Sequence, residues 1–386
     1  MRLSVVALLL VFFGCATDSK KETVEEQTLA ANSSALNEKY EVVCFVYHRF
    51  GDSRYPSTNV STKDFESHLS WLKANNYRVV TLSQALENQA GGSAHVRTAV
   101  ITIDDGYKSF FENALPLLKK FGFQATLFIN TETVGSDDYM DWSELERATA
   151  AGVEIGNHTH SHSYFLNIDE TNRYATFEGE IKNSQQLIEK ELGHKPKVFA
   201  YPYGEFDPEM KMIVKALGFK SAAAQNSGVI NATTDLFELP RFPMSENYAD
   251  MFEEKAKMHA MSVTAKQPES HMLPRKNSRP TLSLVIKKQK LITDQFNCFI
   301  QGSKCKLKVT PESDSTVRVT VQSESSIARA RRTLYTITAP DNSGEWYWYS
   351  HLWINPAVSE SCTKSNFRPS RYHYVTDSLW IRQNGK

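Results

Sequence analysis

Short apolar runs alternate with segments of helical periodicity between about residues 40 and 260 of this chain. Seven of the runs are typical of buried strands and lie at residues 41–47, 78–81, 99–103, 125–129, 153–156, 198–201 and 219–224. Because strands that alternate with helices are joined by crossovers, the sheet should be mostly parallel and covered on both faces. We therefore expect an α/β fold over residues 39–262, a distorted or incomplete (β/α) barrel of about seven strands.

The pattern changes after about residue 260. Residues 263–280 are polar and contain proline, and we interpret them as a linker. Runs of alternating polarity then predict a small all-β, sandwich-like accessory domain over residues 281–386. Its most aromatic stretch begins Trp346-Tyr347-Trp348-Tyr349. These rings could stack on sugars, but their alternation favours a strand whose alternate aromatic side chains fill the sandwich core.

The charge balance limits the partners of the chain. It has 44 basic and 44 acidic residues, whereas binding to nucleic acid or to an anionic membrane requires an excess of basic charge. The interior of the chain contains no apolar run long enough to span a bilayer. We expect no nucleic-acid partner and no membrane contact from the body of the chain.

The first 15 residues are typical of an export signal, with Arg2, a short apolar run and then Gly14-Cys15. Gly14-Cys15 resembles a bacterial lipoprotein signal, in which Cys15 is lipidated; ordinary cleavage and an uncleaved anchor remain alternatives. Residues 16–38 lack periodicity and are rich in polar residues, which indicates a flexible tether. We expect an exported, periplasm-facing or outer-membrane lipoprotein that contacts the membrane only through its lipid.

Export permits disulfides, and the cysteines suggest one pair. Cys298 and Cys305 flank a predicted hairpin turn around Gly302, so a disulfide across its two strands is expected. Cys44 lies within an apolar run and is expected to be a buried thiol, and Cys362 has no evident partner. Since no Cys-x-x-Cys pair occurs, a thiolate zinc site is not expected.

Two adjacent carboxylates, Asp104 and Asp105, end the third predicted strand and precede Gly106. Like charges this close repel, so the pair needs a cation or a role in proton transfer. A bound metal is the simplest remedy, although an acidic turn after a strand is an alternative of similar weight.

Three histidines follow the fifth predicted strand, in the sequence His158-Thr159-His160-Ser161-His162. Neutral imidazole is a common ligand of zinc and similar cations, and His158 and His162 are spaced so that both could reach one ion. Two histidines and one aspartate form a facial set that leaves positions open for water and substrate. The alternative is that these histidines are exposed on a loop. The presence of Asp104 and Asp105 in the same chain makes this alternative less favoured.

These segments resemble the polysaccharide deacetylases with a NodB-type domain, carbohydrate esterase family 4. The matching residues are 102–107, Asp141-Trp142, 158–162 and 199–204, within about 220 residues. The resemblance implies Asp105, His158 and His162 as ligands of a divalent metal, with Zn²⁺ first and Co²⁺, Ni²⁺ or Mn²⁺ as alternatives. It also implies Asp104 as general base, the backbone N–H of Tyr203 as an oxyanion donor, and substrate contacts at Trp142, Tyr201 and Pro202.

The chain departs from the family pattern at two places. The usual arginine before the Pro-Tyr loop and the later Leu-x-His are missing, and Leu239-Pro240-Arg241 occupies the second position. We expect Arg241 to orient Asp104 in place of the missing arginine; an ordinary salt bridge to Asp141 or Glu238 is the alternative. The chain also resembles a subset that includes poly-N-acetylglucosamine deacetylases and begins with Tyr-His, which implies His48 as general acid.

Together these features predict a metal-dependent hydrolase of linear amide bonds. The expected reaction is de-N-acetylation of an N-acetylglucosamine-containing polysaccharide, peptidoglycan first and poly-N-acetylglucosamine next, with release of acetate. The alternative from a different class is a catalytically silent glycan-binding protein of the cell envelope. All of the expected catalytic residues are present, which favours the enzyme.

Overall fold

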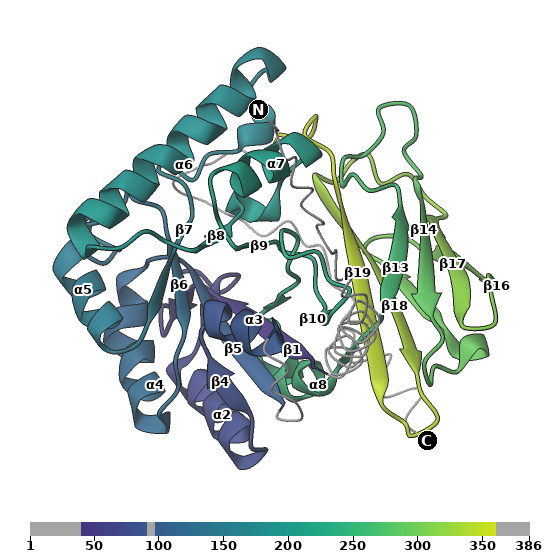
Figure 1. The fold of residues 1–386 in the computed structure, drawn as a ribbon, viewed down its shortest axis with the longest axis horizontal. Helices are drawn as coiled ribbons and strands as arrows, with labels where there is room; N and C mark the ends of the chain where they lie inside the picture. The colour runs from purple at the N-terminus through teal and green to yellow at the C-terminus, as the bar shows by residue number, and fades with distance from the viewer. Residues whose placement is uncertain (1–39, 91–96, 360–386) are drawn as a thin grey trace, which may run out of the picture.

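The computed structural model describes residues 40–90 and 97–359, and these form two packed parts, a curled α/β sheet and a β-sandwich (Figure 1). The predicted lipidation site Cys15, the tether 16–38 and Cys362 lie outside the described residues. Within the described residues no helix is both long enough and apolar enough to cross a membrane.

All seven strands predicted for the first part are present, and they belong to one nine-stranded sheet that curls into a half-barrel. Along most of the sheet the order is β10-β1-β5-β6-β7-β8-β9. β4 pairs with the first half of β5, and β6 pairs with the second half. The seven predicted strands are β1 Val42–Tyr47, β4 Arg78–Val80, β5 Thr98–Asp105, β6 Thr126–Ile129, β7 Glu154–Asn157, β8 Val198–Ala200 and β9 Ser221–Ala223. Every pair among these seven is parallel, as the crossover argument requires.

Two short strands that the sequence did not predict complete the sheet. β10 (Val229–Ile230) pairs antiparallel with β1, and β11 (Phe242–Pro243) pairs parallel with it. Each has only two residues, too few for a period-2 pattern to be recognised. A separate small ladder joins β2 (Arg49–Phe50) to β3 (Asn59–Val60).

Helices cover the outside of the half-barrel. They are α2 Thr62–Ala74, α4 Leu115–Phe121, α5 Trp142–Ala150, α6 Glu170–Leu192, α7 Pro208–Ala216 and α8 Phe252–Lys257. A further helix, α3 Leu82–Ala90, packs Leu82 and Ala85 on the side chains inside the half-barrel. Local chemistry sets their ends. Asp141 and Glu144 form a reciprocal capping box at the start of α5, and α4 ends at Gly122, whose φ of 69° is in the left-handed region.

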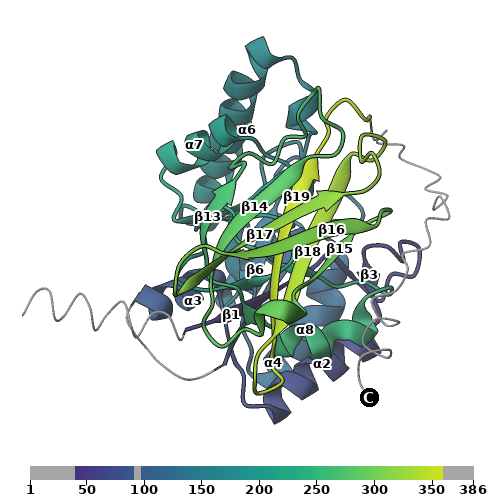
Figure 2. The ribbon, with the colours of Figure 1, turned by 90° about the vertical axis from the view of Figure 1, so that its right-hand side faces the viewer.

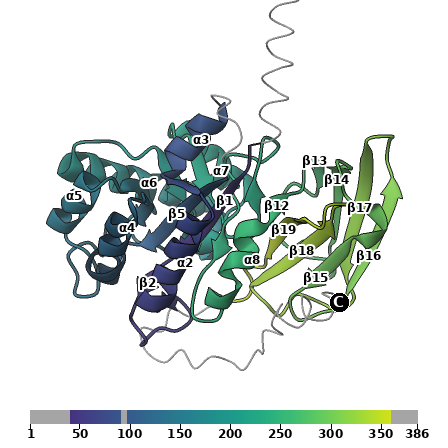
Figure 3. The same cartoon turned by 90° about the horizontal axis from the view of Figure 1, so that it is seen from below.

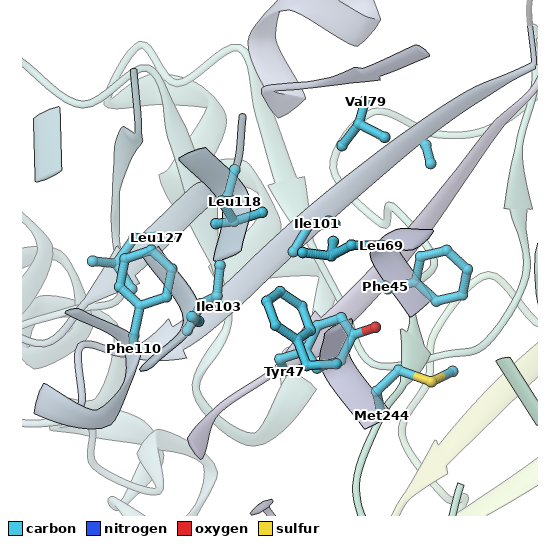
Figure 4. Packing of buried hydrophobic residues seen from close by; sticks show 14 of the residues in the cluster. Phe45, Tyr47, Leu69, Val79, Ile101, Ile103, Phe110, Leu118, Leu127 and Met244 are labelled. Atoms are coloured by element: carbon cyan, nitrogen blue, oxygen red, sulfur yellow. The ribbon is translucent and has the colours of Figure 1, made fainter. Parts of the chain in front are cut away.

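The alternation of side chains along the strands divides the core into two. Phe45 and Tyr47 of β1 pack with Ile101 of β5 and Leu69 of α2 between the sheet and its helices (Figure 4). The intervening residues, such as Cys44, point into the half-barrel and form a second cluster there. Burial raises the pKa of the Cys44 thiol to about 12. The expected buried thiol is confirmed.

Two four-stranded sheets pack face to face to form the sandwich (Figure 2). One has the order β12-β19-β18-β15 and the other β13-β14-β17-β16. Their strands are β12 His259–Ala260, β13 Val263–Gln267, β14 Thr281–Lys287, β15 Asn297–Ile300, β16 Cys305–Pro311, β17 Thr316–Ser323, β18 Arg332–Pro340 and β19 Trp346–Ile354. The predicted linker therefore begins as strand β13, because its polar residues sit on an edge strand that pairs with β14.

The aromatic strand β19 lies where the sandwich meets the barrel (Figures 1 and 3). Tyr347 and Tyr349 pack on the sandwich core. Trp348 points the other way onto the barrel core, where the Lys255 ammonium lies 3.8 Å from its ring centroid. Ser350, on the same face, donates a hydrogen bond of 2.6 Å to the carbonyl of Ser227. The prediction that alternate aromatic residues fill the sandwich core is confirmed for Tyr347 and Tyr349, whereas Trp348 packs on the barrel core.

The predicted disulfide between Cys298 and Cys305 is present, with a Cα–Cα distance of 6.3 Å. The predicted hairpin is wrong, however. Cys298 is on β15, which pairs with β18, whereas Cys305 is on β16, which pairs with β17. The chain crosses from one sheet to the other at the turn between the two cysteines, so the disulfide joins the two layers of the sandwich.

Candidate active site

The register of the sheet brings the predicted site residues to one edge. Tyr47 of β1 lies opposite Ile103 of β5, so His48 and Asp104 follow at the same level. Asp105 lies opposite Ile129 of β6, and Ile129 lies opposite Asn157 of β7, which immediately precedes His158. The carboxyl ends of neighbouring parallel strands thus supply the site, as is usual in α/β sheets.

Asp105, His158 and His162 form a compact group whose ligand atoms lie within 4.8 Å of one another. The Oδ1 atom of Asp105 is 3.6 Å from Nε2 of His158 and 3.4 Å from Nε2 of His162. Asp105 and His162 have φ angles of 77° and 53°, a conformation that costs energy in residues with a Cβ. Such strain is typical of a site whose side chains must converge.

The hydrogen bonds of this group fit a bound cation. Nδ1 of His158 lies 2.7 Å from the carbonyl of Ala200, which can only accept, so Nδ1 carries the proton and Nε2 offers its lone pair. Nε2 of His162 is 3.1 Å from Nε2 of His158, and the buried Oδ1 of Asp105 has no hydrogen-bond partner among the described residues. Burial lowers the pKa of His162 to about 4, so its imidazole is neutral, as a metal ligand must be.

His160, the third histidine of the motif, does not join this group. Its Nδ1 is 2.9 Å from Oγ1 of Thr131. The loop that follows β6 therefore holds this side chain, and His160 is not part of the group of possible metal ligands.

Asp104 occupies a different environment from Asp105, although the two are adjacent in sequence. It points into the half-barrel, where its side chain and that of Arg241 are both fully buried. Nη1 of Arg241 donates to Oδ1 of Asp104 at 2.7 Å, and Nη2 donates to Oδ2 at 2.9 Å. Burial raises the pKa of Asp104, but the charge of Arg241 and its hydrogen bonds outweigh this effect and bring the pKa down to about 2.

Arg241 is fixed by more than its carboxylate partner. Its Nε donates to the carbonyl of Ala224 at 2.9 Å, and its backbone N–H donates to the carbonyl of Asn226 at 2.9 Å. The two alternative partners are engaged elsewhere. Asp141 caps α5, and Glu238 binds Lys211, Lys266 and His271. The geometry thus places Arg241 on Asp104.

The Pro-Tyr loop approaches the histidines from the end of β8. Tyr203 has a φ of 58° and Gly204 a φ of 68°. A Cβ at Gly204 would lie 2.5 Å from Cβ of Gln225, so only glycine fits there. The ring of Tyr203 lies 4.5 Å from that of His162 and stacks on Tyr164 at 3.6 Å, with an angle of 5° between the planes.

The side chains predicted to contact the substrate differ in how far they are buried. Tyr201 is fully buried, stacks on Phe206 and donates to the carbonyl of Phe237 at 3.2 Å, so its side chain belongs to the core and does not face a glycan. Pro202 is buried too, and Trp142 packs partly buried against the barrel core. Tyr201 and Pro202 thus turn into the core after β8, whereas Trp142, the first residue of α5, keeps part of its surface exposed.

His48 lies half-buried directly after β1. It is close enough to Asp104 and Asp105 to interact electrostatically with both carboxylates. The sequence reasoning did not identify Tyr164, Glu205, Arg331 or Arg332, which also surround this site. Glu205 follows the Pro-Tyr loop directly and could have been considered, whereas the two arginines come from the sandwich and carry no local signal.

Comparison with known proteins is consistent with this geometry. The family profile described as "Polysaccharide deacetylase" matches residues 91–222. A poly-beta-1,6-N-acetyl-D-glucosamine N-deacetylase of Staphylococcus aureus is 27% identical in an alignment of 236 residues that covers 58% of this chain and 80% of that protein.

Solved structures share the fold of the barrel. The deacetylase PplD of Streptococcus pyogenes, in complex with acetate, has a TM-score of 0.51 at 19% identity and covers 56% of this chain and 98% of its own. IcaB from Ammonifex degensii has a TM-score of 0.50 at 24% identity, covering 56% of this chain and 97% of its own.

Proposed function

This chain belongs to the polysaccharide deacetylase family, and we propose that it removes N-acetyl groups from a β-1,6-linked poly-N-acetylglucosamine in a metal-dependent reaction. It is a hydrolase of N-acetylated polysaccharide; the polymer and the metal are the proposed parts. The observation that carries the metal dependence is the buried, unpartnered Oδ1 of Asp105 between two imidazole nitrogens. A carboxylate oxygen left without a partner in the interior is costly unless a cation neutralises it.

We assign the ligands to Asp105, His158 and His162, with Zn²⁺ as the first candidate and Co²⁺, Ni²⁺ or Mn²⁺ as alternatives. One carboxylate and two imidazoles are a donor set that zinc and these other cations accept. Such a cation supplies Lewis-acid polarisation of an acetamide carbonyl and activation of water.

The remaining groups have distinct proposed tasks. Asp104, ionised at neutral pH because its pKa is about 2, accepts a proton from the attacking water. Arg241 keeps both oxygens of that carboxylate in place. The backbone N–H of Tyr203 donates to the developing oxyanion, and His48 protonates the departing amine.

The proposed polymer follows from the relatives. The sequence alone ranks peptidoglycan first; the named activity of the S. aureus relative, which this chain matches over most of that protein's length, supports poly-N-acetylglucosamine ahead of it. The proposed site of action is the cell envelope, with Cys15 as lipid anchor. Mass spectrometry of the mature N-terminus tests the anchor, since a diacylglyceryl group on Cys15 is expected.

Acetate release by the purified protein tests the proposed function. Poly-β-1,6-N-acetylglucosamine oligomers and purified peptidoglycan are compared, each with and without a chelator followed by Zn²⁺. We expect release from the oligomers to exceed release from peptidoglycan, to stop with chelator and to return with metal. Release that survives complete metal removal would contradict the metal assignment, and release only from peptidoglycan would contradict the polymer.

A further inference from the structure

The Pro-Tyr loop of the barrel is tied to the sandwich by a buried ion pair. Glu205, the residue after Gly204, and Arg331, the residue before β18, are both almost fully buried. Nε of Arg331 donates to Oε1 of Glu205 and Nη2 donates to Oε2, each at 2.6 Å. Two such parallel bonds fix the position and the orientation of the carboxylate.

Other hydrogen bonds complete the pairing from both sides. Nη1 of Arg331 donates to Oδ1 of Asn167 and to the carbonyl of Val358, each at 2.8 Å. Nη1 of Arg332 donates to Oε1 of Glu205 at 3.0 Å. A buried pair is tolerated only when its charges are satisfied in this way, and removing one partner leaves an uncompensated charge.

The same arginines also lie against the aromatic side of the loop. The guanidinium of Arg331 is 4.7 Å from the ring centroid of Tyr164, and that of Arg332 is 5.8 Å from the ring of Tyr203. Because Tyr164 stacks on Tyr203 and Tyr203 contacts His162, a continuous series of contacts runs from the sandwich to the metal-ligand group.

The loop needs such support. Tyr203 has a positive φ without being glycine, and conformations of this kind persist only where surrounding contacts hold them. The backbone N–H proposed to stabilise the oxyanion belongs to this strained residue, and its direction depends on the strained dihedral angles. A group that must meet a developing charge works only when it is oriented beforehand.

We propose that Arg331 and Arg332 are positioning residues of the deacetylation site, so that the β-sandwich holds the Tyr203 loop in its working conformation. The proposal rests on the proposed function for the role of the Tyr203 amide. It gives the sandwich a task in the reaction itself, through the loop that Arg331 and Arg332 hold.

Steady-state kinetics of the full chain carrying Arg331→Gln test this proposal. A misoriented oxyanion donor reduces the stabilisation of the transition state more than the binding of the substrate. We therefore expect kcat to fall by about 10- to 100-fold with little change in KM. Arg331→Lys, which retains the charge without the planar fork, should recover part of the loss. The matched control is Arg318→Gln, which removes a half-exposed ion pair with Glu312 elsewhere on the sandwich and should leave kcat unchanged.

Hydrogen–deuterium exchange provides a readout that does not depend on activity. Peptides covering residues 201–206 should exchange faster in Arg331→Gln than in the wild type, while peptides from β5 remain unchanged. If the wild type releases no acetate from any polymer but the exchange result holds, the proposed function fails and the positioning role of the arginines stands. Unchanged exchange in the loop together with unchanged kcat would overturn the proposal.

Arg332→Gln provides a second variant if Arg331→Gln does not fold. The side chain of Arg332 is 27% exposed, so its replacement disturbs the core less. We expect a smaller fall in kcat, a thermal midpoint close to that of the wild type and faster exchange in the same loop peptides. A folded Arg332→Gln variant with wild-type kcat and wild-type loop exchange would overturn the proposal.

Discussion

Arg241 donates hydrogen bonds of 2.7 and 2.9 Å to the two carboxylate oxygens of Asp104 inside the half-barrel, and both side chains are fully buried. The two residues are 137 positions apart in the chain. Asp104 and Asp105 are adjacent yet differ in their surroundings, because Arg241 binds Asp104 and not Asp105. Asp105 instead faces the two imidazoles, with one oxygen unpartnered.

Replacing Arg241 by Gln leaves a buried carboxylate without a counter-charge. We expect a loss of about 3–5 kcal/mol in the free energy of unfolding, measured by denaturant titration. Acetate release should fall by about 100-fold or more, since Asp104 is then neither held nor kept ionised. Lys120→Gln, which breaks an exposed ion pair with Glu66, is the control and should change the free energy by less than about 1 kcal/mol. A stable and active Arg241→Gln variant would refute this account.

Glu238 joins the barrel to the sandwich through an ion cluster whose strength should depend on pH. It accepts hydrogen bonds from Nζ of Lys211 at 2.7 Å and Nζ of Lys266 at 2.8 Å, and Nε2 of His271 lies 3.1 Å from its Oε2. Burial raises the pKa of Glu238, but these partners outweigh it and hold the pKa well below its ordinary value of 4.5. A lowered folded-state pKa stabilises the protein above the ordinary value, and this stability is lost as the pH falls toward the lowered one.

The thermal midpoint of Glu238→Gln should therefore lie well below that of the wild type at about pH 7, and the gap should narrow on acidification below about pH 4.5. Scanning calorimetry of both proteins over this range checks the prediction. Glu312→Gln, on an exposed part of the sandwich, is the control and should show a small gap at every pH. A gap for Glu238→Gln that stays constant with pH would argue against the cluster.

The disulfide between Cys298 and Cys305 closes a short loop, with a sequence separation of 7. Chain-entropy arguments give about 2–3 kcal/mol of stabilisation for a loop of this length. Reduction should lower the thermal midpoint of the wild type. A variant carrying both Cys298→Ser and Cys305→Ser should start at the lower midpoint and show no response to reductant. A wild-type midpoint that does not respond to full reduction would contradict a stabilising role.

Local patterns were sufficient where a residue's role depends on its own strand. The seven strands follow from apolar runs. Asp105 ends β5 and the two histidines follow β7, and these carboxyl ends lie at one edge of the parallel sheet with only β6 between them, so Asp105, His158 and His162 converge. The same logic places His48 beside Asp104. Here the sequence could be interpreted correctly without knowledge of distant contacts.

Contacts across long distances could not be derived in this way. The partner of Arg241 stayed open between three carboxylates, because nothing in its own segment specifies which one it meets. Arg331 approaches the Pro-Tyr loop from another layer of the molecule, and a buried Tyr201 cannot be distinguished by composition from an exposed one. The hairpin at Gly302 was predicted from turn chemistry, which does not specify whether the next strand stays in the same sheet.

Asp105→Asn separates metal binding from the rest of the site. The amide is a weaker ligand and carries no charge, so we expect loss of bound metal in elemental analysis and loss of the rise in thermal midpoint that Zn²⁺ gives the wild type. His160→Asn is the control, since His160 contacts Thr131 and not the ligand group. Wild-type metal content in Asp105→Asn would contradict the ligand assignment.

Acetate release by purified Asp104→Asn, measured on poly-β-1,6-N-acetylglucosamine oligomers beside its metal content, tests the central claim most directly. Asn preserves the shape of the side chain and removes its ability to accept a proton. We predict wild-type metal content with kcat reduced by about 100-fold or more. A variant that retains both its metal and the wild-type kcat would contradict Asp104 as the base and, with it, the division of labour between the two adjacent carboxylates.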